Sequence, residues 1–158
     1  MDMNASYNKL VTKHLPKAQI VYDRFHMQSQ FGRDFLGVVR LDEARRHKAK
    51  EKEILADISD DTDKETMKSH KQEAKAEKQG YSQLKKLRWS LLINSDKLSD
   101  SKTEQLQSIL QDHHDLAVCY AMKEKMCRLY ELTDYQQSVT GWTKWFQAAK
   151  ESEIPALV

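Results

Sequence analysis

Glycine and proline are scarce in this sequence. Its 158 residues include only 4 glycines and 2 prolines. All-β and doubly wound folds need many turns, and turns depend on these two residues. Lysine, glutamate, glutamine, alanine and leucine are abundant instead, and these residues favour helices. The composition therefore predicts a mainly helical protein.

Cysteine and long apolar runs are also rare. The 2 cysteines, Cys119 and Cys127, fall in one predicted helix, where their separation spans about 12 Å along the axis. A disulfide needs a much shorter distance, so we expect free, buried thiols. No apolar run approaches the ~20 residues of a membrane-spanning helix, and the first residues do not resemble a signal peptide. We therefore expect a soluble, cytoplasmic protein.

Charge of one sign is not in excess. The chain has 26 basic and 24 acidic residues, a net charge of +2, and 32% of its residues are charged. A domain that binds nucleic acid through a broad electrostatic surface is usually far more basic. Contact with DNA would therefore depend on local clusters of basic residues.

The first part of the chain has the pattern of a small α/β unit. Asn4 can cap a helix that Pro16 ends, and residues 18–22 form a short β-branched and aromatic run. A helix that leads into such a run is half of an α/β unit. We predict one short strand at residues 18–22, the only strand in a mainly helical chain.

Several helices are predicted after this unit. Residues 42–78 are rich in mixed charge and predict a solvated helical hairpin, with Thr62 or Asp63 as the N-cap of its second helix. Gly32 and Gly37 weaken the preceding helix unless another element packs closely there. Three apolar stripes at helical spacing predict a core; they contain Tyr81, Leu84, Leu87 and Leu91, then Cys119, Met122, Met126, Leu129 and Tyr130, and finally Trp142, Trp145, Phe146 and Ala149.

Two short acidic segments could carry chemistry. Asp2 lies at the start of the first predicted helix, and Asp23 and His26 directly follow the predicted strand. Functional groups gather at the carboxyl ends of strands in open α/β sheets, and paired carboxylates suit hard divalent cations. The structural alternatives are a helix-capping aspartate and a hydrogen-bonded histidine. The residues alone leave both open.

Several segments together resemble the DDE transposases of bacterial insertion sequences of the ISL3 type. Residues 2–7 read DMNASY and residues 15–26 read LPKAQIVYDRFH, which is similar to the family's pattern of DM followed by DRFH. Weaker similarities are LDEARR at residues 41–46, KLRWSLL at 86–92 and WTKW at 142–145. The resemblance covers essentially the whole chain.

The resemblance implies a ribonuclease-H-like catalytic core, part of it at residues 1–45, interrupted by a helical insertion at 46–158. In such enzymes three carboxylates bind Mg²⁺ or Mn²⁺ for attack on a DNA phosphodiester. By this resemblance Asp2 is the second catalytic aspartate and a metal ligand, while Asp23 and His26 support the site. The implied partner is DNA at insertion-sequence ends, in the bacterial cytoplasm.

The departures from the family pattern predict a fragment. The resemblance places another catalytic aspartate before Asp2 and a catalytic glutamate after the insertion, and neither is found in the sequence. We therefore expect the chain to be inactive alone and to bind no metal tightly. A second hypothesis is a stand-alone helical binding or inhibitory protein that self-associates, and a third is a small metal-dependent hydrolase that uses Asp2, Asp23 and His26.

Local basic clusters are the candidate DNA contacts. One includes Arg40, Arg45 and Arg46, and the other places Lys85, Lys86 and Arg88 beside Trp89. Basic side chains hold phosphates, and an exposed aromatic ring can stack on an unpaired base. The interpretation we favour for Trp89 is instead a core side chain, with the neighbouring lysines in solvent.

Overall fold

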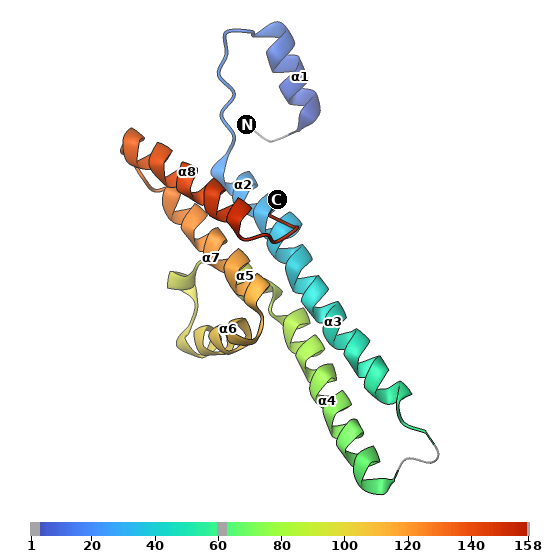
Figure 1. Ribbon diagram of the computed structural model, residues 1–158. Coiled ribbons are helices and arrows are strands. Elements are labelled where there is room, and N and C mark those ends of the chain that lie inside the picture. Colours follow the sequence, from blue (N-terminus) through green and yellow to red (C-terminus); the bar gives the residue numbers. More distant parts are fainter. Residues whose placement is uncertain (1–3, 60–62, 158) are drawn as a thin grey trace.

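The computed structural model describes residues 4–59 and 63–157, and these form helices joined by short connections (Figure 1). In chain order the elements are α1 (Ala5–His14), α2 (Arg24–Phe31), the π-helix η1 (Gly32–Leu36), α3 (Gly37–Ala56), α4 (Lys64–Lys86), α5 (Arg88–Leu92), the 3₁₀ turn η2 (Ser95–Lys97), α6 (Asp100–Asp112), α7 (His114–Leu129) and α8 (Tyr135–Glu151). The prediction of a mainly helical protein is confirmed. Over these two ranges, no helix is long and apolar enough to cross a membrane.

The predicted strand at residues 18–22 is wrong. These residues form an irregular segment between α1 and α2, and Val21 is 68% exposed. A strand persists only where its backbone groups pair with a neighbour, and residues 4–59 and 63–157 contain no other strand to pair with. The ribonuclease-H-like α/β piece expected at residues 1–45 is therefore wrong as well.

Helix α1 lies apart from the rest of the molecule (Figure 1). Its N-cap is Asn4, whose Oδ1 accepts a hydrogen bond from the Ser6 backbone N–H at 2.9 Å, as predicted. None of its residues is buried, because its apolar side chains meet no other helix. A hydrogen bond of 2.9 Å from Asn8 Nδ2 to the Tyr22 hydroxyl ties α1 to the segment that follows it.

A nearly continuous helix from Arg24 to Ala56 forms the long axis of the body. It consists of α2, η1 and α3, and α4 runs back antiparallel to α3 to make the predicted hairpin (Figure 1). Asp63 caps α4 by accepting from the Glu65 and Thr66 backbone N–H groups at 2.9 and 3.0 Å, as one of the two predicted caps. The expected domain boundary at residues 45 and 46 lies within α3, and that division stays a prediction.

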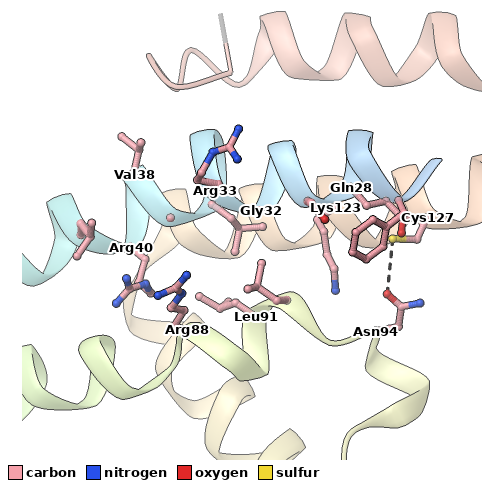
Figure 2. A pocket seen from close by; sticks show the side chains of 16 residues that line it. Gln28, Gly32, Arg33, Val38, Arg40, Arg88, Leu91, Asn94, Lys123 and Cys127 are labelled. Carbon is pink, nitrogen blue, oxygen red and sulfur yellow. Dashed lines mark hydrogen bonds between the residues drawn. The ribbon is translucent and has the colours of Figure 1, made fainter. Parts of the chain in front are cut away.

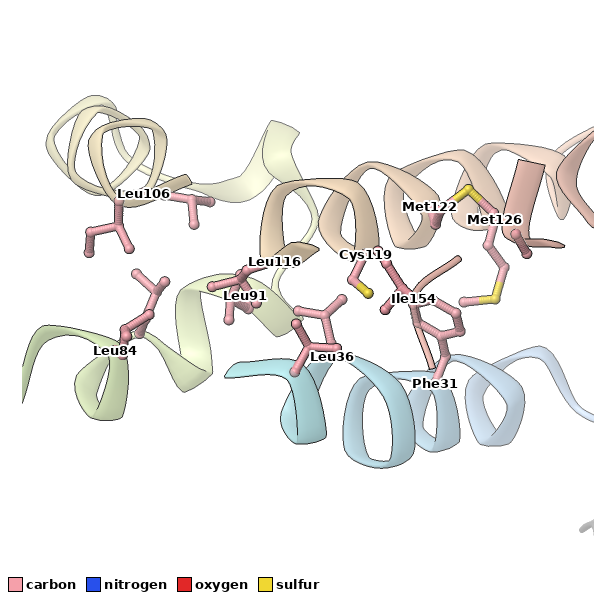
Figure 3. Close-up of a cluster of buried hydrophobic side chains, with 14 of the residues drawn as sticks. Phe31, Leu36, Leu84, Leu91, Leu106, Leu116, Cys119, Met122, Met126 and Ile154 are labelled. Carbon is pink, nitrogen blue, oxygen red and sulfur yellow. The ribbon is translucent and has the colours of Figure 1, made fainter. Parts of the chain in front are cut away.

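The core lies where α7 packs between the α2–η1–α3 helix and α8. Figure 3 shows Phe31 and Leu36 facing Cys119, Met122 and Met126 of α7, with Leu84 and Leu91 extending the same cluster. Trp145 closes it from α8 through a hydrogen bond of 2.8 Å from Nε1 to the Met122 carbonyl oxygen. The three predicted apolar stripes are confirmed as core, with two differences: Phe146 is 57% exposed, and Tyr81, Tyr130 and Trp142 are only partly buried.

The two cysteines are free and buried on α7, as predicted. Burial raises the pKa of the Cys119 thiol to about 12, and the negative charge of Asp115 adds to this effect. A thiol in this state is neither a nucleophile nor a metal ligand at neutral pH. Both cysteines therefore have a packing role.

Candidate functional site

The main cavity of the described residues is a groove of about 610 Å³ between the α2–η1–α3 helix and α5 (Figure 2). Its floor includes Gly32, Leu91 and Leu92. Gly32 is required there because a Cβ atom would collide with the Leu92 side chain. The close packing that the sequence demanded for a glycine inside a helix is thus supplied by α5.

The charged side chains that line the groove are all basic. They are Arg33, Arg40, Arg88 and Lys123, and no aspartate or glutamate is among the lining residues. Figure 2 shows Arg40 and Arg88 side by side at one end and Lys123 further along. The groove therefore has the electrostatic character of a site for an anion.

Arg40 is buried although it carries a full charge. It is 6% exposed, and its Nη1 donates to the carbonyl oxygens of Leu84 and Lys85 at 3.0 and 3.3 Å. These carbonyls belong to the last turn of α4, where they lack helical partners and carry partial negative charge. Burial, and then the positive charge of Arg88, lower the pKa of the Arg40 guanidinium below its usual value.

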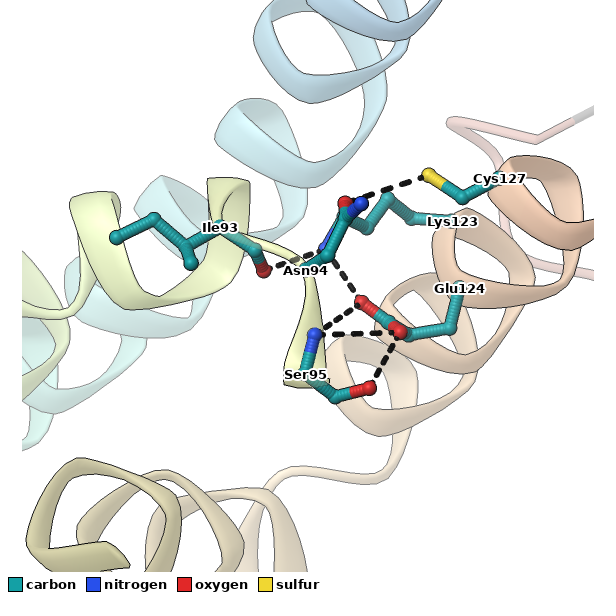
Figure 4. Close-up of polar contacts among 6 residues, drawn as sticks. All are labelled: Ile93, Asn94, Ser95, Lys123, Glu124 and Cys127. Carbon is teal, nitrogen blue, oxygen red and sulfur yellow. Dashed lines mark hydrogen bonds and ion pairs between the residues drawn. The ribbon is translucent and has the colours of Figure 1, made fainter. Parts of the chain in front are cut away.

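Lys123 is held in place by a polar cluster that joins α7 to the α5–η2 turn (Figure 4). Its Nζ donates to the Ile93 carbonyl oxygen at 2.7 Å and to Glu124 Oε1 at 2.5 Å. The other oxygen of Glu124 accepts from the Ser95 hydroxyl at 2.7 Å. Burial would raise the pKa of the Glu124 carboxyl, but the hydrogen bonds from Lys123 and Ser95 outweigh it and lower that pKa.

Trp89 is exposed, so the interpretation that it belongs to the core is wrong. It is 67% exposed on α5, because Leu87 and Leu91 fill the buried side of that short helix. The Arg88 guanidinium lies over its ring, 5.1 Å from the centroid. Two neighbouring predicted contacts, Lys85 and Lys86, are exposed at the end of α4, and Lys85 Nζ lies 5.9 Å from the Tyr81 ring centroid.

Arg45 and Arg46 lie outside the groove, further along α3. Each pairs with a carboxylate of its own helix: Arg45 with Asp42 at 2.6 Å, and Arg46 with Glu43 at 2.5 Å. The structure therefore brings Arg40 and Arg88 together across the chain and leaves Arg45 and Arg46 on the side of the hairpin. Their predicted role in DNA contact stays untested.

Asp23 is the N-cap of α2. Its Oδ1 accepts from the backbone N–H groups of Phe25 and His26 at 2.7 and 3.3 Å. The His26 ring lies edge-on to the Phe25 ring, with centroids 5.8 Å apart. The third predicted site residue, Asp2, lies outside the described residues.

The described residues do not fit a divalent metal site. Across residues 4–59 and 63–157, no group of three or more histidine, cysteine, aspartate or glutamate side chains is placed to hold an ion. The proximal oxygen of Asp23 is already used in capping α2. We derive no metal-dependent step from these residues.

Two groove residues were missed by the sequence patterns. Arg33 is exposed and pairs with Asp34 at 2.7 Å, so it resembles any surface ion pair. Lys123 offered a signal: it directly follows Met122 inside an apolar stripe, and such a lysine must find buried partners. Recognising it would have pointed to the α5–η2 turn.

Comparison with known proteins defines the class. A family model described as "Transposase", for the DDE transposases of the ISL3 type, matches residues 1–158. The chain therefore belongs to this family of transposases, and the resemblance noted in the sequence is confirmed.

A curated relative gives a more particular similarity. The chain is 26% identical over 157 residues to the transposase for insertion sequence element IS1001 from Bordetella parapertussis. The match covers 99% of this chain and 32% of the relative, so the chain spans about a third of that protein's length. No solved structure matches the chain.

Proposed function

We propose that this chain is part of a transposase that cuts and joins DNA at the ends of an insertion sequence. The family match along the whole chain is the observation that carries this proposal. The relative that shares nearly all of this chain, yet is about three times as long, supports a division of labour within a larger protein. Cutting and joining would be performed by that larger protein.

Asp2 is the proposed catalytic residue and metal ligand of this part. The segments DMNASY and DRFH, which carried the resemblance, support this assignment. Asp23 and His26 are proposed as supporting residues, and the capping of α2 by Asp23 gives this support a physical form. Mg²⁺ or Mn²⁺ would serve the complete enzyme by activating the attacking hydroxyl.

The chain is expected to be inactive alone. Phosphoryl transfer of this type needs several carboxylates that converge on the ions, and the described residues gather no such group. The test is an incubation of the purified chain with DNA from the ends of its element in Mg²⁺ or Mn²⁺. We expect no nicking, and nicking that Asp2→Ala abolishes would contradict this.

The helical body is proposed to hold DNA. The groove lacks acidic lining residues, and Lys85, Lys86, Arg88 and Trp89 are exposed beside it, while Arg40 lies within it. Arg45 and Arg46 are retained as weaker candidates, because their charges are partly offset by Asp42 and Glu43. Backbone contacts of this kind release counterions, so binding should fall steeply with salt.

Fluorescence anisotropy with labelled duplex and branched DNA tests the holding role. We expect binding at low salt that weakens linearly on a log–log plot as salt increases. Replacing both Lys85 and Lys86 by glutamine should lower the slope by about 2, one for each phosphate contact. The matched control is the same double change at Lys75 and Lys78, which are exposed on α4 and far from the groove along the helix. The absence of binding at low salt would count against the proposal.

A second candidate is a helical binding or inhibitory protein that acts through self-association. The observation that favours it is the apolar side of α8, where Tyr135 is 75%, Val139 45% and Phe146 57% exposed. Exposed apolar patches of this kind mark interaction surfaces. Sedimentation of the chain would detect self-association, and Phe146→Ser should abolish it. A monomer at all concentrations would remove this candidate.

A further inference from the structure

The groove contains one pair of positive charges that no carboxylate balances. Arg40 and Arg88 lie close enough for the charge of Arg88 to lower the pKa of Arg40. Among the residues that the structure describes, neither guanidinium forms an ion pair with an aspartate or glutamate. Two like charges held together, one of them buried, are unfavourable without an anion.

The neighbouring cations show that this arrangement is unusual. Arg33 pairs with Asp34 and Lys123 with Glu124, both at the border of the same groove. Arg45 and Arg46 have partners one turn away on α3. Around this groove, an acidic neighbour accompanies each of these exposed or buried cations, and the exception is the Arg40–Arg88 pair.

The hydrogen bonds of Arg40 fix the orientation of its guanidinium. Its Nη1 is held by the Leu84 and Lys85 carbonyl oxygens, so the ring of donors cannot rotate freely. A guanidinium has five N–H groups, and those on Nε and Nη2 have no hydrogen-bond acceptor within residues 4–59 and 63–157. Two parallel N–H donors in one plane match two oxygens of a phosphate.

Arg88 is also restrained, although it is exposed. Its guanidinium lies over the Trp89 ring, which holds the side chain near α5 at the mouth of the groove. Figure 2 shows it beside Arg40, on the same side of the cavity. The pair therefore presents donors from α3 and from α5 to one position.

We propose that the Arg40–Arg88 pair is a binding site for a single phosphate group, supplied by the backbone of a DNA strand that crosses α5. This inference rests on the proposed function, because the choice of DNA as the source follows from the transposase family. The groove is open and has room for a nucleotide, and the exposed Trp89 lies where the neighbouring base would be. Free phosphate shares the same chemistry, and the experiment distinguishes the two sources.

The test uses the full chain and three variants. Arg88→Gln removes the exposed charge of the pair without disturbing the core. Arg40→Lys keeps the charge but loses the planar fork, and it tests the buried partner if the fold is retained. The matched control is Arg128→Gln, an exposed arginine on α7 that does not line the groove.

Anisotropy with labelled DNA is the first arm. Arg88→Gln should weaken binding about tenfold at low salt and lower the salt slope by about 1, whereas Arg128→Gln should change neither by as much. Arg40→Lys should weaken binding as well. Equal binding by Arg88→Gln and the control would overturn DNA as the source of the phosphate.

Titration with inorganic phosphate is the second arm, with tryptophan fluorescence as the readout. Phosphate that draws Arg88 away from the Trp89 ring should change the emission in a saturable way, and Arg88→Gln should remove that change. Trp89→Phe identifies the contribution of Trp89 against Trp142 and Trp145. No saturable change, together with unaltered DNA binding by Arg88→Gln, would overturn the site. If no form of the chain binds DNA, the holding role fails, and this arm alone decides whether the pair binds phosphate.

Discussion

Replacing Glu124 by glutamine should destabilise the chain by breaking the cluster that joins α7 to the α5–η2 turn. The Lys123 side chain is 5% exposed and that of Glu124 13%, so the substitution leaves a buried ammonium without its counterion. Removing one partner of a buried pair costs about 3–5 kcal/mol. Glutamine still accepts from Ser95, which places the expected loss near the lower end, at about 3 kcal/mol.

Thermal unfolding followed by circular dichroism measures this loss. For a chain of this size, about 3 kcal/mol corresponds to a Tm lower by about 6–12 °C. Glu104→Gln is the matched control, because Glu104 is exposed on α6 and takes part in no printed contact of this cluster. A Tm within about 2 °C of the original chain would refute the reasoning.

The pH dependence gives an independent check of the same cluster. The folded-state pKa of Glu124 is lower than its usual 4.5, so its charged form stabilises the fold above that value. This contribution disappears as pH falls through the lowered pKa. The difference in stability between the original chain and Glu124→Gln should therefore be full at neutral pH and shrink in acid. A difference that grows in acid would contradict the assignment.

Three further predictions follow from single positions. Gly32→Ala should cost about 1–3 kcal/mol, because its Cβ meets Leu92, and adding Leu92→Ala should recover part of that clash in denaturant unfolding. Cys119, with its pKa raised to about 12 by burial, should react with iodoacetamide far more slowly in the native chain than in urea, and equal rates would contradict its burial. Asp23→Ala should destabilise α2 by about 1 kcal/mol whereas Asp23→Ser should not, and equal losses would show that capping is not its role.

The helical body follows closely from the sequence because its apolar spacing leaves few alternatives. Leu84, Leu87 and Leu91 recur at helical intervals, and burial of that face is the simplest way to remove them from water. The caps Asn4 and Asp63 are equally local, since each needs only its own side chain and the N–H groups that follow. Local rules of this kind predicted the helices well.

The strand and the groove depended on information that is not local. Residues 18–22 have the β-branched composition of a strand, but a strand needs a partner, and none is found in the described ranges. Arg40 and Arg88 are far apart in the sequence and meet only because α4 returns antiparallel to α3. Trp89 was assigned to the core from its apolar neighbours, whereas the direction of the short α5 turns it outward.

The most direct test of the central claim is strand cleavage by the complete transposase to which we propose this chain belongs. Asp2→Ala in that protein should abolish cleavage of insertion-sequence ends in Mg²⁺ and in Mn²⁺, while binding of the same DNA persists. Arg88→Gln should do the reverse, weakening binding but leaving cleavage at saturating DNA. Cleavage by the Asp2→Ala protein at the original rate would contradict the claim that this chain contributes a catalytic carboxylate.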